Sequence, residues 1–300
     1  MPDAYPHPNP LVIIVNHQRP KDTIECIQSL QASKTVQAEV LVVDNGSPDR
    51  SAEQITAALP DVEILRLKDN LGFAGGYNAG IRHGLANRSA SEFFLLNNDT
   101  IIDPLAMDAL ARSSWDVAVP KILYHQEPGL IWAAGADWRA FPPAVIMHGH
   151  RKLDGPRYDR ARRLDYATGC ALWVKRPVLE SVGGFDERFV NYMEDYDFAY
   201  RVRAAGYQIG YVPGARVYHK VAQTLGVQSA ERWRYLGRNT VLFYRLEERF
   251  PIWKLWSFLS WVTLRETLKG QAAYLPHYWQ GVREGVSRLA EWEENGNRRL

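Results

Sequence analysis

Short apolar runs alternate with segments of helical periodicity over the first hundred residues of the chain. The runs at 11–15, 40–43, 62–67 and 93–96 are rich in Val, Ile, Leu and Phe, and they predict buried strands. Between these runs, apolar residues recur three or four positions apart, which predicts helices. Strands that alternate with helices of this length predict right-handed βαβ units and a mostly parallel, doubly wound sheet, which is an α/β fold.

The second half of the predicted sheet follows a different pattern. Beyond Pro120 the apolar runs are shorter and separated by turns, which predicts antiparallel elaboration of the sheet. Residues 165–174 and 207–212 predict two further strands. The basic stretch 151–163 has no apolar periodicity, so it predicts a mobile surface loop, either solvated or in contact with a phosphorylated acceptor.

The C-terminal part of the chain is predicted to be helical and is rich in tryptophan. Residues 229–248 and 252–268 carry apolar residues at helical spacing, so we expect an α/β part over 1–225 and a helical extension over 226–300. Residues 220–300 hold 13 Lys/Arg against 8 Asp/Glu and six of the ten tryptophans. Charges interrupt the apolar run at 252–268, so it does not predict a bilayer-spanning helix. Two interpretations stay open: packing on the α/β part or in a homodimer, and contact with a membrane surface.

Composition narrows the class of protein. A chain of 300 residues with 46% hydrophobic content can bury a sizeable core. No basic segment precedes the first apolar run, so a cytoplasmic location is expected. Cys26 and Cys170 lie far apart and in no C-x-x-C pattern, which predicts two buried thiols rather than a disulfide or a zinc site.

Polar residues follow two of the predicted strands at the point where each strand ends. Asp44 and Asn45 follow the second run, and Asn97, Asn98 and Asp99 follow the fourth. Because the carboxyl ends of parallel strands face the crevice where ligands bind, we expect these side chains at one site. Their oxygens suit Mg²⁺ or Mn²⁺ carrying a diphosphate, and Asp44 could bond a ribose hydroxyl or a base N–H. Ordinary turn and capping roles are the alternative for each of them.

Two further stretches carry candidate chemistry. The glycine-rich stretch 70–80 opens a predicted helix and would let backbone approach a ligand, although it does not spell G-x-G-x-x-G after a strand. Glu194, Asp195 and Asp197 begin another predicted helix among aromatic residues. Partial burial there would raise a carboxylate pKa into the range of a useful general base, whereas the alternative is simple charge decoration of a helix N-terminus.

Taken together, these motifs resemble the family 2 inverting glycosyltransferases of the GT-A fold, and among them the rhamnosyltransferase-like bacterial members. The resemblance covers roughly residues 11–225 and consists of several motifs in the family's order. It implies a GT-A type nucleotide-binding catalytic domain at 1–225, with a mostly parallel doubly wound sheet, followed by C-terminal helices. Separately, the absence of G-x-G-x-x-G after a strand disfavours a dinucleotide oxidoreductase.

The resemblance also implies roles for individual residues. Asp195, in the position of the catalytic base, and Glu194 form the family's Glu-Asp pair. The family's D-x-D metal motif falls on 97–99 with an amide in place of its first acid, so Asp99 and His219 are the implied ligands of Mn²⁺ or Mg²⁺. The implied donor-binding residues are Asp44, Asn45, Asn70, Gly72, Phe73, Gly75, Asn78, Asn97 and Asn98.

The implied activity is transfer of a sugar from a nucleoside diphosphate sugar to a hydroxyl of a glycan or lipid-linked acceptor in cell-surface polysaccharide synthesis. By resemblance the sugar would be L-rhamnose from dTDP-rhamnose, and the protein would work in the cytoplasm or peripherally on the inner face of the cell membrane. A sugar nucleotidyltransferase and a non-catalytic nucleotide-sugar-binding scaffold are the alternatives. No recognised motif indicates a nucleic-acid partner.

Overall fold

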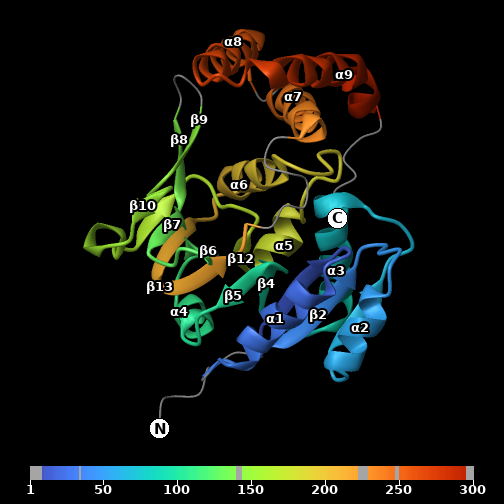
Figure 1. The fold of residues 1–300 in the computed structure, drawn as a ribbon, viewed down its shortest axis with the longest axis vertical. Helices are drawn as coiled ribbons and strands as arrows, with labels where there is room; N and C mark the ends of the chain where they lie inside the picture. Colours follow the sequence, from blue (N-terminus) through green and yellow to red (C-terminus); the bar gives the residue numbers. More distant parts are fainter. Residues whose placement is uncertain (1–8, 34, 140–143, 222–228, 247–249, 295–300) are drawn as a thin grey trace.

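The computed structural model describes residues 9–33, 35–139, 144–221, 229–246 and 250–294. A central sheet runs through the α/β part (Figure 1). Its first half contains four parallel strands in the order β3-β2-β1-β4: β1 (Leu11–Asn16), β2 (Glu39–Asp44), β3 (Glu63–Arg66) and β4 (Glu92–Asn97). The chain leaves β1 on one side toward β2 and returns on the other as β4, so the strand order reverses beside β1. In open α/β sheets, ligands bind in a crevice at the carboxyl ends of the strands, at the point where the strand order reverses.

The second half of the sheet is mixed, as the shorter apolar runs predicted. β12 (Ala171–Lys175) runs antiparallel to β4 and to β6 (Val117–Tyr124), whereas β13 (Ile209–His219) runs parallel to β6. The remaining strands extend this half or form a separate hairpin: β5 (Thr100–Ile102), β7 (Leu130–Ala133), β10 (Lys152–Leu153) and β11 (Arg162–Leu164) in the sheet, and β8 (Ala136–Arg139) with β9 (Ala144–Met147) in the hairpin.

Helices cover both faces of the sheet and bury a separate apolar cluster on each. One face is covered by α3 (Gly72–Asn87), α5 (Arg176–Val182) and α6 (Glu194–Ala204). The other is covered by α1 (Pro20–Gln31), α2 (Ser51–Ala58) and α4 (Ala106–Ala111). Cys26 and Cys170 are free and buried, as predicted. The doubly wound α/β architecture is therefore confirmed.

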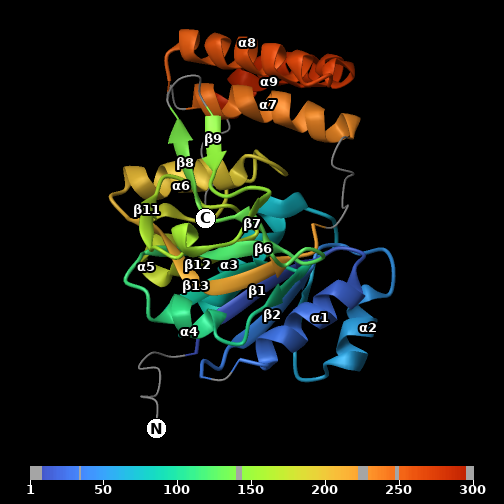
Figure 2. The same cartoon turned by 60° about the vertical axis from the view of Figure 1, so that its left-hand side comes forward.

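The C-terminal helices form a further layer above α6 and the β8–β9 hairpin (Figure 2). This layer consists of α7 (Ala230–Arg245), α8 (Ile252–Leu268), the 3₁₀ turn η3 (Ala272–Tyr274) and α9 (Leu275–Glu294). α7 and α9 touch through glycines: a Cβ at Gly237 would lie 2.0 Å from the carbonyl oxygen of Tyr278, so no larger residue fits. The predicted boundary at 225/226 lies outside the described residues. No described helix is both long and apolar enough to cross a bilayer.

Two local predictions were wrong. The 151–163 stretch is not a simple loop, because it contains β10, the 3₁₀ turn η1 (Pro156–Tyr158) and the start of β11. Lys121 of β6 is fully buried, and its Nζ lies 2.8 Å from Asp154 Oδ1 and 2.6 Å from Asp159 Oδ1. A buried ammonium needs charged partners, so the ion pairs of Lys121 hold the 151–163 stretch against β6. The strand predicted over 165–174 begins only at Ala171, because residues before it turn toward α6.

Candidate active site

The carboxyl ends of β1 and β2 form one side of the candidate site. Asp44 is 6% exposed, and its Oδ1 accepts hydrogen bonds from Asn16 Nδ2 at 3.0 Å and from Ser47 Oγ at 2.5 Å. Thr23 Oγ1 donates to Asn16 Oδ1 at 2.8 Å and accepts from Asn98 Nδ2 at 3.1 Å. A continuous hydrogen-bonded chain therefore joins Asp44 to the Asn98 side of the site, and it holds the carboxylate in one orientation.

Asn45 organises the loop that leads into α3. Its Nδ2 donates to Asn70 Oδ1 at 3.0 Å and to the carbonyl of Gly72 at 2.9 Å, and its Oδ1 accepts from the N–H of Leu71 at 3.0 Å. The predicted donor residues Asn45, Asn70 and Gly72 are thus brought together. Gly75 lies buried in the first turn of α3.

The start of α3 is joined to the turn that precedes α6. The N–H of Phe73 donates to Asn191 Oδ1 at 2.9 Å, and the N–H of Ala74 donates to the carbonyl of Val190 at 3.1 Å. The N–H of Gly72 donates to Asn70 Oδ1 at 2.9 Å. These N–H groups at the helix start are therefore used within the protein, and they connect the strand-end residues to the 189–193 turn. Close approach of a ligand to the glycine-rich backbone stays a prediction.

Asn78 has a structural role in place of the predicted donor contact. Its side chain is 1% exposed, and Nδ2 donates to the carbonyl of Phe185 at 2.7 Å and to Glu187 Oε1 at 3.0 Å. Its Oδ1 accepts from the N–H of Phe185 at 2.8 Å. Both amide hydrogens are used, so Asn78 ties α3 to the segment before α6 and has no donor left for a nucleotide.

Asp99 and His219 form a buried pair behind the end of β4. His219 Nε2 lies 3.2 Å from Asp99 Oδ1, and both residues are under a tenth exposed. Burial alone would lower the pKa of His219, but the neighbouring Cys170 and Asp99 raise it above its ordinary value. No cluster of three or more His, Cys, Asp or Glu side chains capable of holding a metal occurs among the described residues. One carboxylate and one imidazole nevertheless form a donor set that fits a divalent cation whose remaining ligands come from a diphosphate and water.

Asn97 lies between this pair and α3. Its Oδ1 accepts from the hydroxyl of Tyr77 at 3.2 Å, and its backbone N–H donates to the carbonyl of Cys170 at 2.9 Å. The amide that replaces the first acid of the D-x-D motif is therefore held at the edge of the site by neutral partners.

Both oxygens of the Asp195 carboxylate accept hydrogen bonds from the protein. Its Oδ2 accepts from the hydroxyl of Tyr166 at 2.5 Å and from the N–H of Gly169 at 3.0 Å, and its Oδ1 accepts from the N–H of Tyr196 at 2.9 Å. Burial raises the pKa of Asp195, while these hydrogen bonds favour its charged form and oppose that rise. The carboxylate is thus oriented and its basicity is increased.

Glu194 has the opposite environment. It is 5% exposed, and its Oε2 has no hydrogen-bond partner within the described part of the chain. Burial, together with the charges of Asp195 and Asp197, raises the pKa of Glu194 well above its ordinary value. Of two adjacent carboxyl groups, the one whose charged form accepts more hydrogen bonds ionises more readily. Asp195 therefore gives up its proton more readily than Glu194 does.

Gly169 and Cys170 connect the three parts of the site. A Cβ at Gly169 would lie 2.8 Å from the ring of Phe73 and 3.6 Å from Asp195 Cβ, and Cys170 lies beside His219. The predicted donor stretch, base and metal pair thus meet around two adjacent residues. Sequence reasoning missed Tyr166, Gly169, Asn16 and Thr23 as functional partners, and only the small residues at 167–171 gave a signal.

Comparison with known proteins identifies the family. The model of the family described as "Glycosyl transferase family 2" matches residues 11–171, more than half of the chain, and that stretch contains the ends of β1, β2 and β4. The chain belongs to glycosyl transferase family 2. A second model, "Glycosyl transferase family group 2", matches residues 162–280 of this transferase, which include the Glu194–Asp195 pair and α7.

Relatives and solved structures agree with this assignment. The transferase is 29% identical over 276 residues to N-acetylglucosaminyl-diphospho-decaprenol L-rhamnosyltransferase of Mycobacterium tuberculosis, covering 84% of this chain and 86% of that protein. Its fold is similar to that of the mannosyltransferase PcManGT from Pyrobaculum calidifontis, solved with GDP-Man and Mn²⁺, with a TM-score of 0.59, 12% identity and coverage of 94% and 88%. It is also similar to GalNAc-T7, solved with UDP, GalNAc and Mn²⁺, with a TM-score of 0.62, 15% identity and coverage of 81% of this chain but only 49% of that one. The predicted family, GT-A fold and glycosyltransferase activity are confirmed.

Proposed function

We propose that the transferase moves L-rhamnose from dTDP-L-rhamnose to a hydroxyl of a lipid-linked or glycan acceptor, with inversion, in cell-surface polysaccharide synthesis. The name of the mycobacterial relative supports a rhamnosyl donor and an N-acetylglucosaminyl-diphospho-polyprenol acceptor. The observation that carries the proposal is the carboxylate of Asp195, held by Tyr166 and Gly169 next to the donor stretch.

Asp195 acts as the general base in this mechanism. It takes the proton of the acceptor hydroxyl, whose oxygen attacks the anomeric carbon while the nucleoside diphosphate leaves from the opposite face. A single displacement of this kind inverts the anomeric centre. A positioned base of this type contributes about 10²–10⁴-fold to the rate. Burial raises the pKa of the neighbouring Glu194 well above its ordinary value, which disfavours a second negative charge next to the base.

The donor binds at the carboxyl ends of β1, β2 and β4. Asp44 accepts hydrogen bonds from the base or ribose, since Asn16 and Ser47 already fix its orientation. Asn45, Asn70, Gly72, Phe73 and Gly75 shape the wall beside it, and Asn97 and Asn98 form its edge.

Asp99 and His219 would hold Mn²⁺ or Mg²⁺, and a bound cation would neutralise the charge that develops on the departing diphosphate. Both structural neighbours were solved with Mn²⁺, which supports a divalent cation at this fold's donor site. The imidazole favours Mn²⁺ over Mg²⁺.

A membrane contact through α8 is the second part of the proposal. Large apolar side chains gather on the exposed face of this helix: Ile252 is 50% exposed, Trp253 58%, Trp256 53%, Leu264 53% and Leu268 77%. Lys254 and Lys269 flank them. Tryptophan beside lysine is typical of helices that lie in the lipid interface, and an acceptor carried on a polyprenol would be presented there. We therefore propose peripheral association with a bilayer, with a homodimer through the same face as the alternative.

The decisive experiment is a calorimetric titration with dTDP, UDP and GDP, each with and without Mn²⁺, followed by a transfer assay with the matching sugar nucleotide. Binding of dTDP strengthened by Mn²⁺, and rhamnosyl transfer to a lipid-linked N-acetylglucosamine diphosphate, would support the proposal. Preference for UDP or GDP would change the proposed donor nucleotide but would not affect the proposed mechanism of transfer. Absence of binding to any nucleotide would favour the scaffold alternative.

A further inference from the structure

The turn that delivers Glu194 and Asp195 to the site has an unfavourable backbone. Val190, Tyr192 and Met193 have φ angles of 63°, 66° and 69°. Non-glycine residues rarely adopt this left-handed region, and a β-branched valine is especially disfavoured there. Such a conformation persists only where the surroundings enforce it.

The surroundings that enforce it belong to α7. Asn239 is fully buried, and its Nδ2 donates to the carbonyls of Phe189 at 2.9 Å, Asn191 at 2.8 Å and Tyr192 at 2.7 Å. The neighbouring Arg238 donates through Nη2 to the carbonyls of Arg188 at 3.1 Å and Phe189 at 2.8 Å. Two consecutive side chains of one helix therefore satisfy the backbone acceptors of four residues.

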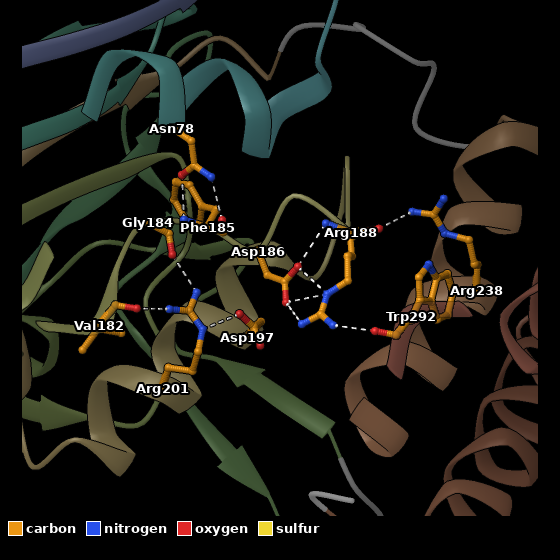
Figure 3. Close-up of polar contacts among 10 residues, drawn as sticks. All are labelled: Asn78, Val182, Gly184, Phe185, Asp186, Arg188, Asp197, Arg201, Arg238 and Trp292. Atoms are coloured by element: carbon orange, nitrogen blue, oxygen red, sulfur yellow. Dashed lines mark hydrogen bonds and ion pairs between the residues drawn. The ribbon is translucent and has the colours of Figure 1, made fainter. Parts of the chain in front are cut away.

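Further polar contacts hold the residues that precede the turn (Figure 3). The guanidinium of Arg188 pairs with Asp186 at 2.6 Å and reaches the carbonyl of Trp292 on α9 at 3.3 Å. Asn78 of α3 binds Phe185, while Arg201 of α6 pairs with Asp197 and donates to the carbonyls of Val182 and Gly184 at 2.7 Å. The segment has little freedom, because each end and its middle are bound to a different helix.

The turn also presses on the donor loop. A Cβ at Gly72 would lie 2.7 Å from Val190 Cγ1, and Val190 and Asn191 accept the N–H groups of Ala74 and Phe73. A shift of the turn would therefore move the base relative to the donor stretch.

We infer that Asn239, assisted by Arg238, is a positioning residue for catalysis, so that the C-terminal helices form part of the active site. The inference rests on the proposed role of Asp195 as the base. Packing alone does not account for the arrangement. The buried amide of Asn239 is directed at three carbonyls of one strained turn, so it fixes the backbone conformation of that turn.

The test is the full-length variant Asn239→Asp, which keeps the size of the side chain and replaces its donor with an acceptor. Val241→Ala is the matched control, because Val241 is equally buried on α7 but faces α9 near Gly285. We expect kcat for Asn239→Asp to fall about 10²-fold, the scale of a small misplacement of reacting groups. Nucleotide affinity should change far less, and amide hydrogen exchange at 189–196 should accelerate. Val241→Ala should lower the melting temperature with kcat retained.

A second variant keeps the inference testable if Asn239→Asp does not fold. Arg238→Met removes the two bonds to Arg188 and Phe189, and it should produce a smaller loss of kcat in the same direction. Wild-type kcat and unchanged exchange at 189–196 in either variant would overturn the inference. If Asp195→Asn is inactive while Asn239→Asp and Arg238→Met keep full kcat, the inference fails and the base assignment stands. If Asp195→Asn still transfers sugar, the base assignment fails and the inference fails with it.

Discussion

The hydroxyl of Tyr166 donates to Asp195 Oδ2 across 2.5 Å, and these residues lie 29 positions apart in the chain. Tyr166 precedes β12 and is buried, with its ring 4.6 Å from that of Tyr196. The hydroxyl of Tyr166 and the N–H of Gly169 donate to the same oxygen of Asp195, and the Tyr166 ring forms part of its aromatic surroundings. These hydrogen bonds favour the charged form and oppose the rise in the pKa of Asp195 that burial causes.

The first prediction concerns the base itself. Asp195→Asn should lower transfer by about 10²–10⁴-fold, because the amide cannot take the acceptor proton. Calorimetric affinity for the nucleotide should stay close to that of the wild type, since Asp44 and its partners lie on other elements. Tyr166→Phe is the companion variant: it removes one donor and should cost less. Loss of nucleotide binding together with transfer in Asp195→Asn would contradict the role assigned to this residue.

The second prediction follows from the raised pKa of Glu194. The folded protein keeps this proton at pH values where the unfolded chain has already released it. At low pH, therefore, the ionisation of Glu194 does not reduce the free energy of unfolding of the wild type. Stability is lost as the pH rises above the unfolded pKa, near 4.5. Glu194→Gln mimics the protonated form and avoids the loss. Its melting temperature relative to wild type should therefore be higher at pH 8 than at pH 4.

The control for that experiment is Glu127→Gln, at an exposed position in the turn after β6. It should show no comparable pH-dependent difference. A Glu194→Gln protein whose relative stability is the same at both pH values would mean that Glu194 is ionised in the folded state.

The sequence predicted the fold where periodicity and local chemistry dominate. The four parallel strands, and a helix at Ile252–Leu268, followed from apolar spacing alone. The strand-end residues also converge as the rule for parallel sheets requires. In contrast, the role of Asn78 depends on partners 107 positions away, and the left-handed turn at Val190 depends on Asn239, which lies beyond the α/β part. Such tertiary contacts override local propensity and leave no pattern in the sequence.

The tryptophan-rich C-terminus shows the same limit. The tryptophans of this region fall into a buried group and an exposed group, and membrane contact stays a prediction for the exposed group. Trp233 and Trp292 are buried against the helical layer, whereas Trp253 and Trp256 are more than half exposed on α8. Composition could not separate these two groups, because the packing of α7, α8 and α9 against one another decides which face of each helix is covered.

A third prediction separates the nucleotide contact from the metal contact. Asp99→Ala should remove the strengthening of nucleotide binding by Mn²⁺ and leave the metal-free affinity unchanged. Asp44→Asn should instead weaken binding about 10-fold or more with and without Mn²⁺, the scale of one lost charged hydrogen bond. The control is Asp103→Ala, because Asp103 Oδ1 accepts the N–H of Leu105 near the start of α4. An Asp99→Ala protein that responds to Mn²⁺ as the wild type does would refute the proposed site.

The last prediction addresses membrane association, and the structure dictates its design. Deletion of residues 250–300 would remove α9, whose Trp292 carbonyl binds Arg188 beside the base-bearing turn, so point variants on α8 are the cleaner probe.

The double variant Trp253→Ser/Trp256→Ser removes the two exposed indoles without touching the buried face. We expect the wild type to co-sediment with vesicles containing anionic phosphatidylglycerol, because indoles and lysines suit the lipid interface. The double variant should remain in the supernatant with an unchanged melting temperature and nucleotide affinity. Leu153→Ser, at a 73% exposed position on β10, should still co-sediment. The alternative result is a wild type that does not bind vesicles and sediments as a dimer, with a double variant that sediments as a monomer. In that case the exposed face of α8 joins two copies of the chain.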